Sequence, residues 1–125
     1  MFKDVTLTWG EQSYTVPAKE QMGLILVIED ALAAGTGRQA IGILLGAEGP
    51  SYARLATAYG AALRYAGSTV TDDEIYLSIM EDMAAQSADV AAKVQGAIVA
   101  LLSIIAPPIG AKMAAVYDGG KGGKK

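Results

Sequence analysis

Two pairs of adjacent carboxylates are the residues in this chain whose chemistry would be easiest to use. Asp72-Asp73 and Glu81-Asp82 could hold a cation or act as acid and base, because neighbouring carboxylates shift one another's affinity for protons and cations. Each pair also has a structural explanation. The first follows Thr71 in a pattern typical of a helix start, and the second falls on the expected polar face of that helix. We therefore interpret both as solvated acids and predict no metal site.

The segment Ala34-Gly35-Thr36-Gly37-Arg38 resembles a phosphate-binding loop in its glycine spacing. A true phosphate loop follows a strand and ends in Gly-Lys-Ser or Gly-Lys-Thr. This segment has no such ending, and no strand is expected before it. We interpret it as a connector between two helices and predict no cofactor.

Histidine and cysteine are absent from the 125 residues. Their absence removes the side chain that titrates near neutral pH, the thiolate nucleophile and the usual zinc ligands. We therefore predict that the protein is not an enzyme and has no catalytic residues.

Three tyrosines, Tyr52, Tyr59 and Tyr65, could stack on nucleic-acid bases. Two of them fall on the apolar stripe of an expected helix, where packing in the core is the simpler role. The net charge is −3, and the ten lysines and arginines are scattered apart from a small terminal cluster. Affinity for phosphates needs clustered cations, so we predict no nucleic-acid partner.

These residues must be positioned by a small, mainly helical domain. Residues 5–9 and 13–16 alternate apolar and polar side chains on either side of the turn Gly10-Glu11-Gln12. This pattern predicts a β-hairpin over about 5–16. Its apolar side is expected to carry Val5, Leu7, Trp9, Tyr14 and Val16. Pro17 ends it.

Four longer helices are predicted from apolar spacing and from start and stop residues. They cover about 18–34, 51–66, 72–84 and 88–106, and a short helical piece is expected at 39–45. The first stripe comprises Met22, Ile25, Leu26, Ile28 and Leu32. Ser51 and Thr71 are predicted to cap their helices, and Pro107-Pro108 to end the fourth. Residues 109–117 are expected to form a short helix or turn. The fold is thus mainly α (α+β), one domain over 1–118 with a flexible Gly/Lys tail at 119–125.

The stretch 94–111 carries no charge and could be taken for a membrane segment. Its helical part ends at Ala106, so about 13 residues span roughly 20 Å, less than the roughly 30 Å of a bilayer's hydrocarbon core. We favour a soluble helix and keep a small membrane-active, holin-like protein as the alternative. The first 20 residues contain no apolar run typical of a signal peptide, which indicates a cytoplasmic protein.

Apolar residues make up 52% of the chain and charged residues only 18%. A surface so poor in charge suggests contacts with other proteins, and it is compatible with self-association. The predicted site consists of five partner-binding residues on the most apolar helix: Ile98, Leu101, Leu102, Ile104 and Ile105. Ile104 lies off the main stripe and is expected to be the exposed one. The alternative is that all five pack in the core.

The order of these elements resembles a known family. The chain is similar to tail assembly chaperones of long-tailed phages and gene transfer agents in three features. These are a short N-terminal hairpin, a helical middle containing LATAYGAALRYAGSTVTDDE (55–74), and an alanine-rich amphipathic helix that ends at Pro107-Pro108. The resemblance implies binding of the tape-measure protein in the host cytoplasm, recruitment of tail-tube subunits and absence from the finished virion. A minor structural tail or connector subunit is a further alternative.

The resemblance also implies a longer form made by programmed ribosomal frameshifting. Gly119-Gly120-Lys121 and Gly122-Gly123-Lys124 can each be encoded with the slippery sequence GGGAAAG. A gene that lacks both a slip site and an overlapping downstream frame would remove this hypothesis.

Overall fold

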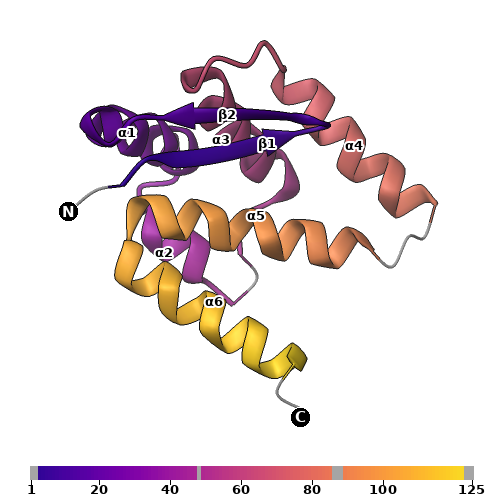
Figure 1. The fold of residues 1–125 in the computed structure, drawn as a ribbon. Helices are drawn as coiled ribbons and strands as arrows, with labels where there is room; N and C mark the ends of the chain where they lie inside the picture. Colours follow the sequence, from indigo (N-terminus) through magenta and orange to yellow (C-terminus); the bar gives the residue numbers. More distant parts are fainter. Residues whose placement is uncertain (1–2, 48, 86–88, 123–125) are drawn as a thin grey trace.

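The computed structural model describes residues 3–47, 49–85 and 89–122. Within this part of the chain, a two-stranded antiparallel hairpin precedes six helices, so the predicted mainly helical fold with an N-terminal hairpin is confirmed (Figure 1). The elements are β1 (Val5–Trp9), β2 (Gln12–Val16), a short 3-10 turn η1 (Ala18–Glu20), α1 (Gln21–Ala33), α2 (Ala40–Leu45), α3 (Tyr52–Tyr65), α4 (Asp72–Ala84), α5 (Asp89–Ile105) and α6 (Pro107–Gly122).

The hairpin forms as the alternation predicts, with Val5 opposite Val16 and Leu7 opposite Tyr14. Leu7 and Val16 are buried in the core, and the other apolar residues of this face pack against it, Trp9 included. An isolated two-stranded hairpin is marginally stable in water, so this apolar face needs cover. Helix α3 supplies part of that cover.

Helix α1 is apolar around most of its circumference, and the side it buries differs in part from the predicted one. Ile25, Ile28 and Leu32 are buried as expected. Met22 and Leu26, however, are 57% and 54% exposed. The polar residue Gln21 is buried in their place, and its side-chain amide donates a hydrogen bond to the Val16 carbonyl at 3.3 Å. A satisfied amide can occupy a core position at low cost.

The glycine-containing segment 34–38 is a connector between α1 and α2, as predicted. Gly35 and Gly37 have φ angles of 75° and 69°, a conformation that favours glycine. The guanidinium of Arg54 donates to the carbonyls of Ala31 and Leu32 at 3.2 and 3.0 Å. These hydrogen bonds satisfy carbonyls at the end of α1 and join it to α3.

Both predicted helix caps are present. The Ser51 hydroxyl accepts a hydrogen bond from the Arg54 backbone N–H at 3.1 Å. The Thr71 hydroxyl accepts from the Glu74 backbone N–H, and the Glu74 carboxylate accepts in return from the Thr71 N–H. This capping box fixes where α4 starts, and each such cap stabilises a helix by about 1 kcal/mol.

Pro107 and Pro108 end α5 as predicted, but α6 begins at the same point. Proline fits the first turn of a helix, where its missing N–H would have no partner within the helix. Helix α6 runs to Gly122 and so exceeds the predicted short helix or turn at 109–117. It includes the first four residues of the predicted tail, and residues 123–125 lie outside the described part of the chain.

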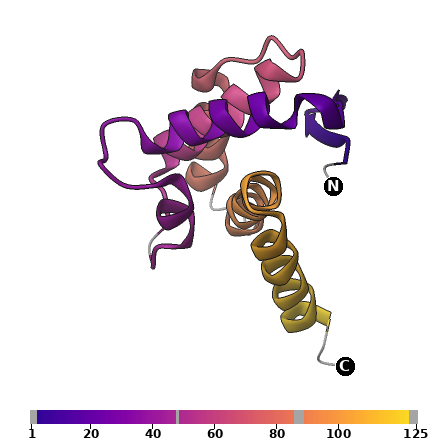
Figure 2. The ribbon, with the colours of Figure 1, turned by 90° about the vertical axis from the view of Figure 1, so that its left-hand side faces the viewer.

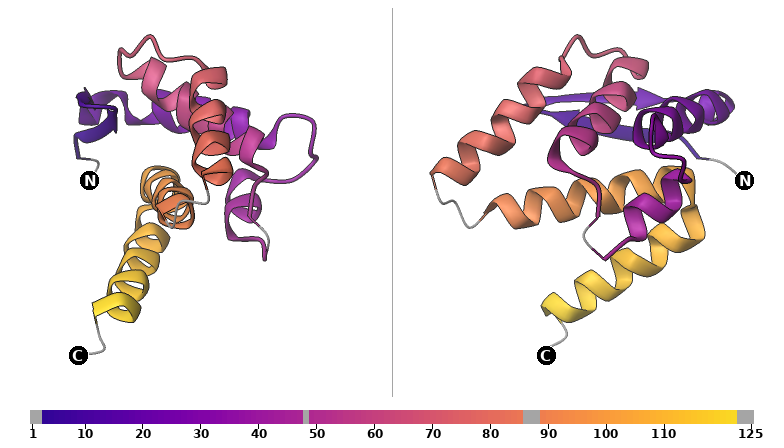
Figure 3. Two further views of the ribbon diagram at one scale, coloured as in Figure 1. Left: turned by 90° about the vertical axis from the view of Figure 1, so that its right-hand side faces the viewer. Right: turned by 180° about the vertical axis from the view of Figure 1, so that it is seen from behind.

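Helices α5 and α6 form a tight helical hairpin. A Cβ atom added to Gly110 would lie 2.4 Å from the Cα of Ser103, so only glycine allows this approach. Figures 2 and 3 show that α6 points away from the rest of the molecule beyond this contact. The core lies elsewhere, between the α1–α3 pair, the hairpin and α5; its largest fully buried side chains are Val16, Leu24, Ile28, Leu32, Leu55, Leu63, Leu101 and Leu102.

Candidate functional site

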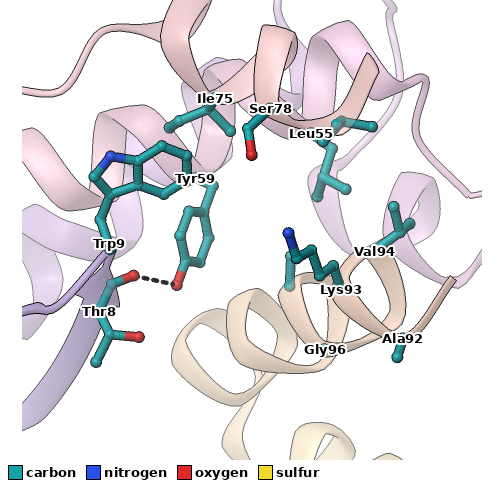
Figure 4. Close-up of a pocket in the computed structure, with 13 residues that line it drawn as sticks. Thr8, Trp9, Leu55, Tyr59, Ile75, Ser78, Ala92, Lys93, Val94 and Gly96 are labelled. Carbon is teal, nitrogen blue, oxygen red and sulfur yellow. Dashed lines mark hydrogen bonds between the residues drawn. The ribbon is translucent and has the colours of Figure 1, made fainter. Parts of the chain in front are cut away.

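An apolar groove with a volume of about 630 Å³ opens between the end of the hairpin, α3, α4 and α5 (Figure 4). Four separate elements therefore build its walls. The lining residues are Thr8, Trp9 and Gly10 from the hairpin, Leu55 and Tyr59 from α3, Ile75, Ser78 and Ile79 from α4, and Ala92, Lys93, Val94, Gly96 and Ala97 from α5. Most of these side chains are apolar, so the groove suits an apolar surface.

Two aromatic side chains lie together at the hairpin end of the groove, as Figure 4 shows. The Tyr59 hydroxyl donates a hydrogen bond to the Thr8 carbonyl at 3.2 Å. This bond ties α3 to β1 and holds the Tyr59 ring in place. Trp9, half-buried beside it, is the chain's single tryptophan.

Burial raises the pKa of Tyr59 above its usual value of 10.0. The folded state therefore favours the protonated hydroxyl, and the stability contributed by Tyr59 is present below pH 10 and lost as pH rises through the raised pKa. Tyr59→Phe is expected to cost about 0.5–1.5 kcal/mol near neutral pH, through the lost hydrogen bond, and to reduce the loss of stability at alkaline pH. Urea unfolding across the alkaline range measures both effects.

The control for this prediction is Tyr76→Phe, because Tyr76 is exposed on α4. The control should leave the unfolding free energy near neutral pH almost unchanged. Parallel pH profiles for wild type and Tyr59→Phe would contradict the prediction.

Lys93 joins two walls of the groove. Its ammonium on α5 forms an ion pair and hydrogen bond with the carboxylate of Asp82 on α4. The predicted polar, fully solvated position of Asp82 is therefore wrong, because its side chain is only 24% exposed and faces α5. The neighbouring Glu81 is exposed as expected.

The other acidic pair is also divided between two environments. Asp73 is exposed, whereas Asp72 is half-buried and forms an ion pair with Arg64 at 2.7 Å. This guanidinium compensates the buried Oδ1 of Asp72, which has no aligned hydrogen-bond donor. Among the described residues, no three acidic side chains converge as metal ligands would.

One edge of the groove is formed by small residues of α5. Ala92 and Gly96 are both exposed. A Cβ atom added to Gly96 would meet no other atom within 4 Å. The space above this part of α5 is therefore open, and another helix could approach it closely.

The five residues predicted to bind a partner lie away from this groove. Leu101 and Leu102 are fully buried, and Ile98 and Ile105 are half-buried against the core. The prediction that Ile104 is exposed is wrong, since it is only 4% exposed. Helix α5 contacts α1, α2, α3, α4 and α6, so its buried arc is wider than one stripe.

The uncharged stretch 94–111 is divided between α5 and α6 at Ala106. In the described ranges, no helix has the combination of length and apolar character that a membrane crossing requires.

Comparison of the chain with models of protein families, with curated proteins and with solved structures found no match.

Proposed function

We propose that the protein is a non-enzymatic chaperone of phage tail assembly. It binds amphipathic helices of the tape-measure protein in the groove, keeps that protein soluble in the host cytoplasm, helps to recruit tail-tube subunits and leaves before the virion is complete. The observation that carries the proposal is the apolar groove between the hairpin, α3, α4 and α5. The order of hairpin, helices and final prolines, on which the family resemblance rests, supports it.

The chemistry of the groove favours a helix as its occupant. Its walls offer the half-buried Trp9, Ile79 and Val94 to an apolar stripe, and its edge at Gly96 leaves room for a helix backbone. This is the arrangement of helix-in-groove recognition, in which apolar anchors recur every three or four residues. Release of water from both apolar faces supplies the driving force, about 25 cal/mol for each Å² buried.

An added β-strand fits less well. A strand would pair with free backbone groups at the edge of β1. The Thr8 carbonyl, where β1 meets the groove, already accepts a hydrogen bond from Tyr59. Strand addition would have to displace that bond.

Co-expression with the tape-measure protein from the same genome tests the proposal. The wild-type chain is expected to keep the tape-measure protein in the soluble fraction, and Gly96→Leu is expected to reduce that fraction several-fold by filling the groove. A Cβ atom at this position meets nothing within 4 Å, and leucine replaces a poor helix former, so the variant should fold. The matched control is Gly42→Leu, at an equally open glycine of α2 outside the groove.

Two results would contradict the proposal. One is a tape-measure protein that stays insoluble with the wild-type chain. The other is the presence of this chain in purified virions by mass spectrometry, which would make it a structural subunit instead. A long tape-measure reading frame directly downstream of the gene is the expected genomic context.

A further inference from the structure

The edge of the groove carries more negative than positive charge. Helix α4 has five carboxylates and no lysine or arginine: Asp72, Asp73, Glu74, Glu81 and Asp82. Ser78 lines the groove, and Glu81, three residues after it, lies on the same side of α4. The Glu74 carboxylate is held by Thr71 in the capping box. Glu11 follows Gly10 at the hairpin end.

The α5 side provides one compensating charge. Lys93 is the cationic residue among those that line the groove, and it is already paired with Asp82. With Glu11, Glu81 and Asp82 against Lys93, the edge has a net negative charge. The cations of an incoming chain would find carboxylates on two sides of its apolar stripe.

The Lys93–Asp82 pair can exchange partners at small cost. The Lys93 side chain is 55% exposed, so its ammonium returns readily to water, and an incoming cation would keep the 24% exposed carboxylate of Asp82 paired. A lysine or arginine of a bound helix could therefore take the place of Lys93 beside Asp82. Lys93 would then extend into solvent while its methylene groups continue to line the groove.

We propose that the groove selects amphipathic helices that carry lysine or arginine beside their apolar stripe, and discriminates against acidic ones. This inference rests on the proposed function, because it specifies which helices of a client chain the chaperone would bind. The occupant is a basic amphipathic helix of another protein.

Titration with two synthetic peptides tests the selection, with Trp9 fluorescence as the readout inside the groove. Both peptides carry leucine at i, i+3, i+4 and i+7; one has lysine at the flanking positions and the other glutamate. The lysine peptide is expected to bind about tenfold more tightly at low salt. The ratio should fall as ionic strength rises, because exposed charges are screened.

Matched substitutions on α4 locate the effect. Glu81→Gln is expected to reduce the ratio of the two affinities, since Glu81 flanks the groove. Asp73→Asn removes the same charge from the same helix but should leave the ratio unchanged, because Asp73 faces a depression on the other side of α4 with Tyr76 and Leu77. Both residues are exposed, so both variants should fold.

Equal or tighter binding of the glutamate peptide would overturn this proposal and leave the proposed function intact. A Trp9 signal that changes when the protein alone is diluted would also overturn it, since the groove would then hold a second copy of the chain. Failure of the proposed function is a separate result, an insoluble tape-measure protein in co-expression.

Discussion

Replacing Leu102 with alanine is expected to lower the free energy of unfolding by about 2–5 kcal/mol, the usual cost of a cavity at a fully buried leucine. Leu102 is 0% exposed and belongs to the core formed with α1 and α3. A loss of this size is a large part of the stability of a small domain. Urea denaturation monitored by circular dichroism measures it.

Ile98→Ala serves as the comparison, because Ile98 lies on the same helix but is only half-buried. Its loss of stability should be clearly smaller. An unchanged unfolding free energy for Leu102→Ala, together with weaker binding of the tape-measure protein, would contradict a core role. It would restore the original interpretation of these residues as partner contacts.

Gly110→Ala is expected to force α5 and α6 apart and to cost about 1–3 kcal/mol, as overpacking usually does. The new methyl group would lie 2.4 Å from the Ser103 Cα and 2.5 Å from its backbone nitrogen. Backbone atoms cannot rotate away as the end of a side chain can. Amide hydrogen exchange should therefore accelerate in α6, while the amides of α1 and α3 keep their protection.

Gly96→Ala is the matched control for this variant. Gly96 lies in the neighbouring helix α5, and an added Cβ atom there meets nothing within 4 Å. Its only expected effect is a gain of up to about 1 kcal/mol from better helix propensity. Unchanged exchange rates in α6 of Gly110→Ala would show that the two helices tolerate a wider separation.

The parts of the fold that sequence predicted well are those fixed by local chemistry. The alternation of apolar and polar residues over 5–16 determines the hairpin. The Ser51 and Thr71 side chains can accept hydrogen bonds only from nearby backbone groups. The starts of their helices can therefore be predicted from the order of residues in the sequence. Helix α1 is different. Nearly every position in it is apolar, so the pattern could not show that Met22 and Leu26 face outward.

The groove could not be predicted because its residues are close only in the folded chain. Trp9 and Tyr59 lie 50 positions apart and meet through packing of the hairpin on α3. The site prediction followed the most apolar stripe of α5, but such a stripe is where a helix joins its own core. The available signals were weaker ones: a lone tryptophan at a strand end, and a glycine, Gly96, inside a predicted helix.

Helix α6 gives the chain a fixed reach. It spans 16 residues, so at 1.5 Å per residue it carries Gly122 about 22 Å from Pro107. A segment added by a frameshift beyond this helix would be tethered at that radius from the α5–α6 corner. Tethering of this kind raises the effective concentration of two binding sites for each other when the linker length matches the span between them. A tube subunit bound to such a segment would then meet a client helix in the groove as an intramolecular neighbour, without any additional contact between them.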